Sequence, residues 1–327
     1  LNKNIKVGFI GLGNFAQTFL MPPLIKQKNV YLHSICNNSG MSSEHMMKKF
    51  NFNSCTTNTT SLINNNDCNT IFIASRHDSH SKYLIDAIKK KKNIFIEKPI
   101  AINENEFTEV KKSLKLIKNN IMMVGYNRRF APASIKMKKL MGDYNEPMSI
   151  HYRINAGAVP LNHWIQDPNI GGGRILGEVC HFVDYLLFLT NSKITYVYAS
   201  ALNSKNINTH GNDTLHIILS FKDGSIATIQ YLANGSRKIE KEYIEVFTGG
   251  DSYTINDFNY GIAYKNNKKI KFYSGMKDKG HSKQIDVFIN SIIKQNNQPI
   301  SLNQIIDGMN VTFKIISSIK TQKAIKV

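Results

Sequence analysis

Short apolar runs alternate with amphipathic stretches over the first 125 residues of the chain. The apolar runs, which we predict as strands, cover residues 6–10, 30–36, 70–74, 93–97 and 121–124. Helices are predicted between them over 42–50, 80–91 and 104–118, and another follows the first strand and ends near Met21-Pro22-Pro23. Ser42 or Ser43 is the expected N-cap of the helix that ends at Phe50. Alternating strands and helices are typical of a parallel sheet covered on both faces.

Beyond about residue 145 the pattern changes to strands that follow one another directly. They are predicted over residues 148–154, 194–201, 213–221, 225–231, 242–247 and 252–255, with a hairpin turn at Lys222-Asp223-Gly224-Ser225. Helices are predicted over 173–189, 283–294 and 301–321, and Pro299 separates the last two. Consecutive strands joined by short turns predict a mostly antiparallel sheet.

The turn after the first strand carries the first candidate chemistry. In Gly11-Leu12-Gly13-Asn14-Phe15-Ala16, Gly11 permits a tight turn, Gly13 lets the backbone approach a pyrophosphate, and Ala16 lets helix and strand pack closely. The helix N-terminus that follows offers free N–H groups and the positive end of its dipole. Because the motif opens a strand–helix–strand series, the predicted fold class is α/β. We predict a doubly wound Rossmann domain with a parallel sheet over residues 1–125 and an α+β domain with a large, mostly antiparallel sheet over residues 126–327.

The end of the second predicted strand bears on the choice between NAD and NADP. A carboxylate there binds the ribose 2′-hydroxyl of NAD, whereas an arginine accommodates the 2′-phosphate of NADP. This chain has Asn37-Asn38-Ser39 at that place, and no arginine follows. Asn37 can hydrogen-bond a hydroxyl and does not repel a phosphate, so both cofactors stay open, with NAD favoured.

Composition narrows the classes of partner. Hydrophobic residues make up 42% of the chain and charged residues 20%, which is typical of a globular core, and no apolar run approaches the ~18 residues that span a membrane. The net charge of +19 rests mostly on lysines spread along the chain, which predicts solvated faces and no nucleic-acid partner. Four cysteines without C-x-x-C or zinc spacing predict reduced thiols, a cytoplasmic location and no metal site. A chain that begins with Leu1 is expected after processing or as a piece of a longer protein.

Three motifs further along make the prediction more specific. Glu97-Lys98-Pro99 and Gly125-Tyr126-Asn127-Arg128-Arg129-Phe130 each follow a predicted strand, and Gly171-Gly172-Gly173 precedes His181 and Asp184. With the glycine turn they resemble, nearly end to end, the Gfo/Idh/MocA family of glucose-fructose oxidoreductase and inositol dehydrogenase relatives. Residues 73–80 and 155–160 are similar to one branch, in which this module is often the C-terminal half of a bi-domain oxidoreductase found with surface-polysaccharide genes.

The family resemblance implies an activity and an assembly. It implies an NAD(P)-dependent dehydrogenase that transfers a hydride between a nicotinamide and a CH–OH group. The implied substrate is a sugar, a polyol or a nucleotide-linked sugar, in surface-polysaccharide or carbohydrate metabolism. It also implies that residues 126–327 form the substrate-binding and oligomerisation domain, with a homo-oligomer formed through the C-terminal sheet.

Lys98 is the first candidate proton partner. Pro99 favours an extended backbone at residue 98, so the backbone aims the side chain. Burial beside a cofactor lowers the pKa of a lysine, which makes it usable as a base. The alternative is one surface lysine among many. Glu97 pairs with Lys98, contacts a cofactor ribose or simply ends a strand.

His181 is the second candidate. Glu178, His181, Asp184 and Tyr185 recur at three- and four-residue spacings and form one polar stripe on the predicted helix. A neighbouring carboxylate orients an imidazole and raises its basicity. The family carries an acidic residue four positions before this histidine, where this chain has Gly177 and places Glu178 one position later. Two alternatives follow for Glu178. Either it replaces that carboxylate from a shifted angle and is a third catalytic residue, or it packs elsewhere.

The remaining expected contacts lie mostly after strand ends, where ligands of such sheets bind. We expect cofactor contacts from Gly11, Gly13, Asn14, Phe15, Ala16, Asn37, Ala74, Ser75, Arg76, His80, Glu97, Lys98 and Asn127. We expect substrate contacts from Arg128, Arg153, Trp164 and Asp184. The alternatives are a helix cap for His80, a salt bridge for Arg128 and core packing for Trp164.

Two other functions fit the same motifs. One is a glycoside hydrolase of the same family that retains NAD, oxidises and re-reduces its sugar, and so shows no net change in nicotinamide. The other is a non-catalytic, nucleotide-binding subunit of a larger protein, which the Gly177 departure keeps open.

Overall fold

The computed structural model describes residues 5–142, 146–202, 213–295 and 297–327, so Leu1 lies outside the described residues. The chain forms two compact units. The first contains the described residues up to Tyr126 together with 169–171 and 281–305, and the second contains 127–168, 172–280 and 306–327 where described. Two later segments of the chain therefore complete the first unit.

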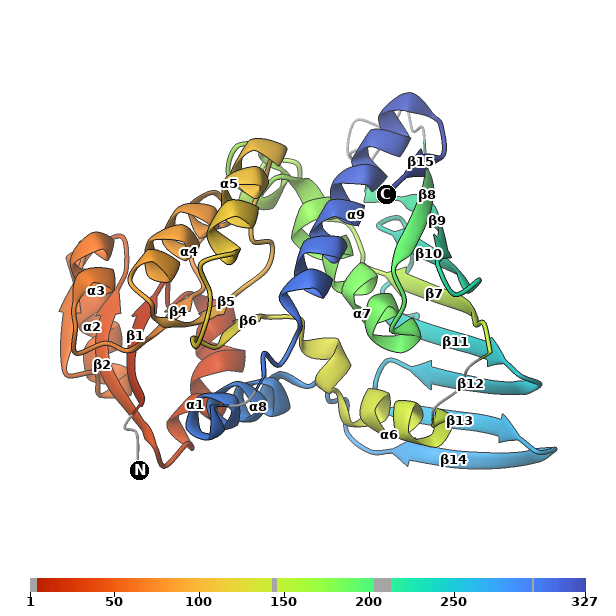
Figure 1. The fold of residues 1–327 in the computed structure, drawn as a ribbon, viewed down its shortest axis with the longest axis horizontal. Coiled ribbons are helices and arrows are strands. Elements are labelled where there is room, and N and C mark those ends of the chain that lie inside the picture. The colour runs from red at the N-terminus through yellow and green to blue at the C-terminus, as the bar shows by residue number, and fades with distance from the viewer. Residues whose placement is uncertain (1–4, 143–145, 203–212, 296) are drawn as a thin grey trace. The chain divides into compact units, whose positions relative to one another are not determined.

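Six parallel strands form the sheet of the first unit, in the order β3-β2-β1-β4-β5-β6 (Figure 1). They are β1 (Ile5–Ile10), β2 (Val30–Cys36), β3 (Ser54–Thr56), β4 (Thr70–Ile73), β5 (Asn93–Ile96) and β6 (Met122–Val124). The strand order runs outward in both directions from β1 and β4, whose carboxyl ends form the switch point where such sheets bind ligands. The predicted doubly wound fold is confirmed. The sequence pattern missed β3, because its Ser-Cys-Thr sequence contains no apolar run.

The α-helices of the first unit lie between its strands and in one later segment of the chain. They are α1 (Met21–Ile25), α2 (Gly40–Phe50), α3 (Thr59–Asn64), α4 (His80–Lys89), α5 (Glu104–Leu114) and α8 (His281–Lys294). The prediction that the first helix ends near Pro22 and Pro23 was wrong. A π-helical turn over Ala16–Leu20 leads into α1, and the two prolines lie in its first positions, where proline is tolerated.

The predicted cap of α2 was also wrong. The helix begins at Gly40, and the Ser39 hydroxyl accepts the backbone N–H of Ser42 at 3.2 Å. Ser39 has an extended backbone, as an N-cap residue requires, and its side chain satisfies one of the helix's free donors.

An aromatic cluster fills the core of the first unit. The ring of Phe72 on β4 stacks on Phe9 and Phe95, with ring centroids 5.4 and 5.0 Å apart. Phe288 of α8 meets Phe72 and Phe95 edge-on, each at 5.6 Å. A helix that comes late in the sequence thus contributes to the core of the parallel sheet, and these ring pairs add to the hydrophobic stabilisation.

Nine strands form the sheet of the second unit, in the order β14-β13-β12-β11-β7-β10-β9-β8-β15. Their bounds are β7 (Ser149–Asn155), β8 (Ile194–Ala201), β9 (Leu215–Phe221), β10 (Ile226–Leu232), β11 (Glu242–Thr248), β12 (Asp251–Asn256), β13 (Tyr260–Lys265), β14 (Lys268–Ser274) and β15 (Ile325–Lys326). All neighbours are antiparallel except β10 and β7, so the predicted mostly antiparallel sheet is confirmed. The lysine-rich edge strand β14 was missed, because charge on an edge replaces the apolar pattern.

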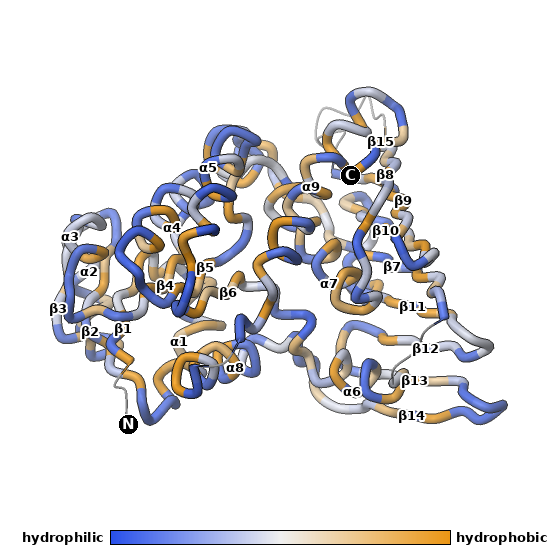
Figure 2. Tube along the Cα trace, viewed as in Figure 1, coloured by the Kyte–Doolittle hydropathy of each residue, from blue (hydrophilic) through white to orange (hydrophobic). Residues whose placement is uncertain are grey.

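Helices cover one face of this second sheet. They are α6 (Pro132–Met141), α7 (Cys180–Thr190) and α9 (Leu302–Thr321), along which hydrophobic and hydrophilic residues alternate (Figure 2). Tyr152 on β7 meets Phe182 and Tyr185 of α7 with ring centroids 5.1 and 5.6 Å apart. The predicted helix over 173–189 exists, but it starts with a π-helical turn over Ile175–Val179. Among the described residues, no helix is both long enough and apolar enough to cross a membrane.

Candidate functional site

The glycine turn follows β1 at the carboxyl edge of the parallel sheet. Gly11 has a φ of +83°, and a β-carbon there would lie 2.5 Å from the backbone N and Cα of Ser75, so the turn requires glycine. A β-carbon on Gly13 would meet nothing within 4 Å. Gln17 donates its N–H to the Gly13 carbonyl at 3.0 Å, so a helical turn starts directly at this open position. An open cradle at a helix N-terminus fits the pyrophosphate of a dinucleotide.

Asn37 braces this turn. Its side-chain oxygen accepts the backbone N–H of Leu12 at 2.8 Å, and its amide nitrogen donates to the Ser42 hydroxyl at 3.2 Å. The structure therefore places Asn37 against the glycine turn, with both ends of its amide engaged by the chain.

The residues after β4 pack on the same turn. Ala74 donates its N–H to the Ile10 carbonyl at 2.8 Å, and Ser75 is the residue that closes the space above Gly11. The side chain of Arg76 is exposed, whereas His80 is fully buried. Of the expected cofactor contacts, the structure thus brings Ala74 and Ser75 to the glycine turn and encloses His80 in the unit.

Glu97 and Lys98 follow β5, where the Glu97 N–H donates to the Ile73 carbonyl at 2.8 Å. The Glu97 carboxyl is buried against Gly125, so closely that a β-carbon on Gly125 would lie 2.5 Å from Glu97 Oε1. Burial raises the pKa of Glu97 to about 7, although the Lys98 ammonium opposes the shift. Among the described residues, Glu97 Oε1 has no hydrogen-bond partner. A carboxyl that is half protonated near neutral pH therefore adjoins Lys98.

Two buried histidines adjoin the half-buried Lys98. Burial, with the nearby charges of Lys98 and His80, lowers the pKa of His77 to about 2, so its ring is neutral. His77 donates from Nδ1 to the Gly171 carbonyl at 2.8 Å, and the Asp78 N–H donates to the Ile170 carbonyl at 3.0 Å. His77 and Asp78 thereby fix residues 169–171, which include the first glycine of the triplet, in the first unit.

In the second unit, Glu178 is the centre of a charged cluster. It accepts bonds from Lys241 at 2.7 Å, from Arg174 at 3.1 Å and from the Tyr231 hydroxyl. Burial alone raises the pKa of Glu178, but these partners outweigh it and lower that pKa to about 2. The Glu178 carboxylate is therefore a fixed anion near neutral pH. His181 begins the next turn of the same helix and is 8% exposed.

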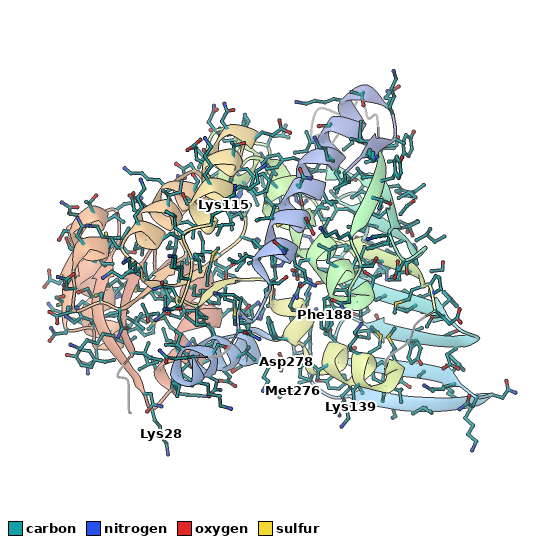
Figure 3. All side chains as sticks on the ribbon, in the orientation of Figure 1. Lys28, Lys115, Lys139, Phe188, Met276 and Asp278 are labelled. Carbon is teal, nitrogen blue, oxygen red and sulfur yellow. The ribbon has the colours of Figure 1, made fainter. Side chains whose placement is uncertain are left out.

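Two buried ion pairs engage the arginines that follow β6. Arg128 binds Glu242 with two bonds, of 2.6 and 2.9 Å, and Arg129 binds Asp184 through Nε at 3.0 Å. Arg129 also lies over the ring of Phe188, which is labelled in Figure 3. Bidentate pairs of this kind fix both side chains. Arg128 and Asp184, which we predicted as substrate ligands, thus bind partners within the protein.

Asn127, Arg153 and Trp164 lie in different parts of the second unit. Asn127 donates to the Lys279 carbonyl at 2.8 Å. Arg153 is next to Tyr152 on β7, so it projects from the sheet face opposite to α7 and is not brought together with His181. Trp164 lies in a short 3-10 turn, Trp164–Gln166, with its ring centroid 5.7 Å from that of His163.

Several polar and charged residues of the site escaped the sequence reasoning. They are Arg174, Tyr231 and Lys241 around Glu178, and Glu242 and Lys279 around Arg128. Only Arg174 carries a local signal, because it lies four residues before Glu178 on one helix. The others come from strands and loops far away in the sequence. Among the described residues, no group of three or more His, Cys, Asp or Glu could hold a metal ion.

Comparison with family models divides the chain into two matched regions. Residues 5–126 match the model of an oxidoreductase family with an NAD-binding Rossmann fold. Residues 140–247 match the model of the GFO/IDH/MocA C-terminal domain. The glycine turn and Glu97-Lys98-Pro99 lie in the first match, and Glu178 and His181 lie in the second.

Similar proteins cover different shares of the chain. Oxidoreductase P35 of Formosa agariphila is 26% identical over 196 residues, which span 57% of this chain and 60% of that protein. A myo-inositol 2-dehydrogenase of Thermotoga maritima is 26% identical over 255 residues, which span 74% and 72%. A levoglucosan dehydrogenase solved with NADH and levoglucosan covers 99% of both chains with a TM-score of 0.85. At 18% identity, this last likeness is one of fold.

Proposed function

Because the chain belongs to the Gfo/Idh/MocA family of oxidoreductases, we propose that it is an NAD(P)-dependent dehydrogenase. Its substrate is a sugar, a polyol or a nucleotide-linked sugar with a secondary hydroxyl. One observation carries the proposal: the open glycine turn and Lys98 lie at the same carboxyl edge of one parallel sheet. This edge is where doubly wound sheets bind nucleotides. The relatives named for inositol and levoglucosan support the substrate class.

The glycine turn is the proposed cradle of the cofactor. Gly13, Asn14, Phe15 and Ala16 would hold its pyrophosphate, because the space beside Gly13 is open and a helix starts there. NAD is the favoured form, since no arginine follows β2 to accommodate a 2′-phosphate. When bound, the nicotinamide supplies the hydride acceptor or donor.

Lys98 is the proposed proton partner of the reacting hydroxyl. In the oxidative direction its Nζ takes the hydroxyl proton, and in the reductive direction it returns that proton. The Lys98 ammonium acts to lower the pKa of Glu97, of His77 and of His80, so its charge reaches three buried side chains.

His181 is the second residue that we propose as a proton partner. Glu178 is too acidic, with a pKa of about 2, to exchange a proton near neutral pH. We therefore propose that Glu178 acts as a permanent anion on the helix of His181, in the role that the family gives to a carboxylate one position earlier. Arg128 and Asp184, each in a buried ion pair, act on the substrate through the positions of their backbone segments.

The open face of the second sheet supports a homo-oligomer. One row of aligned residues crosses seven strands and alternates large apolar side chains with serines: Tyr196, Ser220, Ile226, Ser149, Phe247, Ser252 and Tyr264. The four large side chains are 48–54% exposed. A contiguous apolar patch of this kind marks an interface, and we propose a second copy of the chain as its occupant. The cysteines of the described residues form no disulfide and are mostly buried, which supports a cytoplasmic location.

The first test is a substitution of Lys98. Lys98→Ala should reduce turnover with NAD and a panel of polyols, sugars and nucleotide sugars at least about a hundredfold. It should retain the increase in thermal stability that the cofactor produces. Lys89→Ala, on the exposed end of α4, is the matched control.

Two outcomes would contradict the proposal. A fully active Lys98→Ala variant would remove Lys98 from the reaction. Release of an aglycone without any change in nicotinamide absorbance would identify the NAD-retaining hydrolase instead of a dehydrogenase.

A further inference from the structure

The imidazole of His80 faces two backbone carbonyls. His80 is the first residue of α4 and is fully buried. Its Nδ1 lies 2.8 Å from the Pro99 carbonyl oxygen, and its Nε2 lies 3.0 Å from the Ser75 carbonyl oxygen. Pro99 directly follows Lys98, and Ser75 packs on Gly11 of the glycine turn. One ring thus contacts the segment that carries the proposed proton partner and the segment that closes the cofactor turn.

A neutral ring can donate to only one of these carbonyls, because it carries a single N–H. Burial and the nearby Lys98 ammonium lower the pKa of His80, against the opposing effects of the two carbonyls and Asp78, so the ring is neutral near pH 7. His77, whose ring centroid lies 5.6 Å from that of His80, is neutral as well. The position of the one proton therefore decides which segment the ring holds.

The burial of the two carbonyls indicates where the proton lies. The contact with Pro99 is buried, whereas the contact with Ser75 is only partly buried. A buried carbonyl without a donor costs about 1–3 kcal/mol, whereas water can satisfy a partly exposed one. The contact with Pro99 is also the shorter. Both observations favour the tautomer with the proton on Nδ1.

We propose that His80 is a positioning residue for Lys98, whose Nδ1–H holds the Pro99 carbonyl and so fixes the turn on which Lys98 lies. The inference rests on the proposed role of Lys98 in the reaction. Residue 80 does not touch the reacting atoms itself. Since a displacement of about 1 Å in a catalytic group can cost up to ~100-fold in rate, one hydrogen bond to the neighbouring residue is enough to matter.

Two substitutions separate the two ring nitrogens. The amide nitrogen of asparagine takes the place of Nδ1, and the amide nitrogen of glutamine takes the place of Nε2. His80→Asn keeps the donor to Pro99, and His80→Gln keeps the donor to Ser75. In single-turnover hydride transfer, His80→Gln should be slower by about 10-fold or more and His80→Asn by less than about threefold. Cofactor affinity should stay within about threefold of wild type in both.

Backbone amide exchange gives a readout that needs no activity. Exchange in residues 98–101 should be faster in His80→Gln than in His80→Asn, because only the glutamine variant frees the Pro99 carbonyl. Equal rates of exchange in the two variants, or equal losses of hydride transfer, would overturn the proposal. If neither variant folds, the wild-type protein still decides it, since ring nitrogen chemical shifts report the tautomer. A proton on Nε2 would refute the assignment.

These measurements distinguish the failure of this proposal from the failure of the proposed function. A wild-type chain that shows no turnover with any nicotinamide and polyol contradicts the proposed function alone. The tautomer and the exchange rates then still show whether His80 holds the segment after β5.

Discussion

Two buried carboxylates of the second unit, Glu178 and Glu242, each bind more than one cation. Glu178 contacts Lys241 and Arg174, and Glu242 contacts Arg128 and Lys279. Removal of one partner from a buried pair costs about 3–5 kcal/mol, because an uncompensated charge stays behind. These clusters therefore hold distant strands and helices in one arrangement, and they stay ionised through the pH range in which a dehydrogenase works.

Glu178 makes the stability of the second unit depend on pH. Its pKa in the folded chain, about 2, lies below the ordinary value of 4.5, so the unfolded state binds more protons between these values. The resulting stabilisation, about 3 kcal/mol, is complete above pH 4.5 and is lost as the pH falls towards 2. Urea unfolding of Glu178→Gln and wild type should therefore differ by about this amount at pH 7 and converge near pH 2.

A suitable control for this prediction is a carboxylate outside the Glu178 cluster. Glu245 on β11 faces the open side of the sheet, and Glu245→Gln should change the unfolding free energy by less than about 0.5 kcal/mol. A difference between wild type and Glu178→Gln that did not vary with pH would contradict the assigned ionisation.

At the residue scale, the sequence identifies candidates but not their partners. Lys98 and His181 stand out because short motifs surround them. The partner of Arg128 could not be found in this way, because Glu242 is 114 residues away and lies on a strand with many similar polar positions. For the same reason, the bonds that engage both ends of the Asn37 amide became visible only in the folded chain.

At the scale of the element, two glycines in one turn have separate tasks. Gly11→Ala would place a methyl group 2.5 Å from Ser75 at a φ of +83°, so the variant should lose several kcal/mol of stability. Gly13→Ala would meet no atom of the chain. It should fold with wild-type stability and lose cofactor-induced thermal stabilisation, because its methyl group enters the space of the pyrophosphate.

This pair of variants tests the cofactor site without a substrate. Titration calorimetry with NAD should detect binding to wild type and at least about tenfold weaker binding to Gly13→Ala. Unchanged affinity in a well-folded Gly13→Ala variant would show that the cofactor does not use this turn.

Element types were predicted better than element ends. Apolar periodicity identified most of the strands and most of the helices, because burial of one face decides both patterns. It could not show the π-helical turn before α7, since one extra residue per turn changes few contacts and leaves the apolar stripe recognisable. The short strand β3 and the lysine-rich strand β14 depend on neighbours in the sheet for their hydrogen bonds, which no local pattern reports.

At the scale of the molecule, the exposed apolar row predicts the state of assembly. Ile226 and Phe247 both lie opposite Ser149, on the sheet face opposite to the one that α7 packs against. Light scattering at micromolar concentration should show an oligomer for wild type and a lower mass for Ile226→Glu, because burial of that charge is costly. Leu116→Glu, an exposed apolar position after α5, should leave the mass unchanged. A wild-type monomer would exclude this face as an interface between copies.

The helical pattern of residues 283–294 predicted α8 but not the sheet that it joins. Phe288 reaches the parallel sheet of the first unit, although it lies 162 positions after Tyr126, where the main segment of that unit ends. The packing of α8 on this sheet depends on the complementary shapes of the two surfaces in the folded chain. Sequence periodicity does not report those shapes.

The place of Phe288 in the core has a consequence for how the protein is made. A ribosome adds about 5–20 residues per second, so α8 emerges roughly 8–30 s after the last strand of the parallel sheet. During that interval the rings of Phe72 and Phe95 lack a neighbour that they have in the finished protein. The cofactor-binding half is thus synthesised first and completed late, and a nascent chain is most exposed to misassociation and to chaperones while its nucleotide fold awaits its last helix.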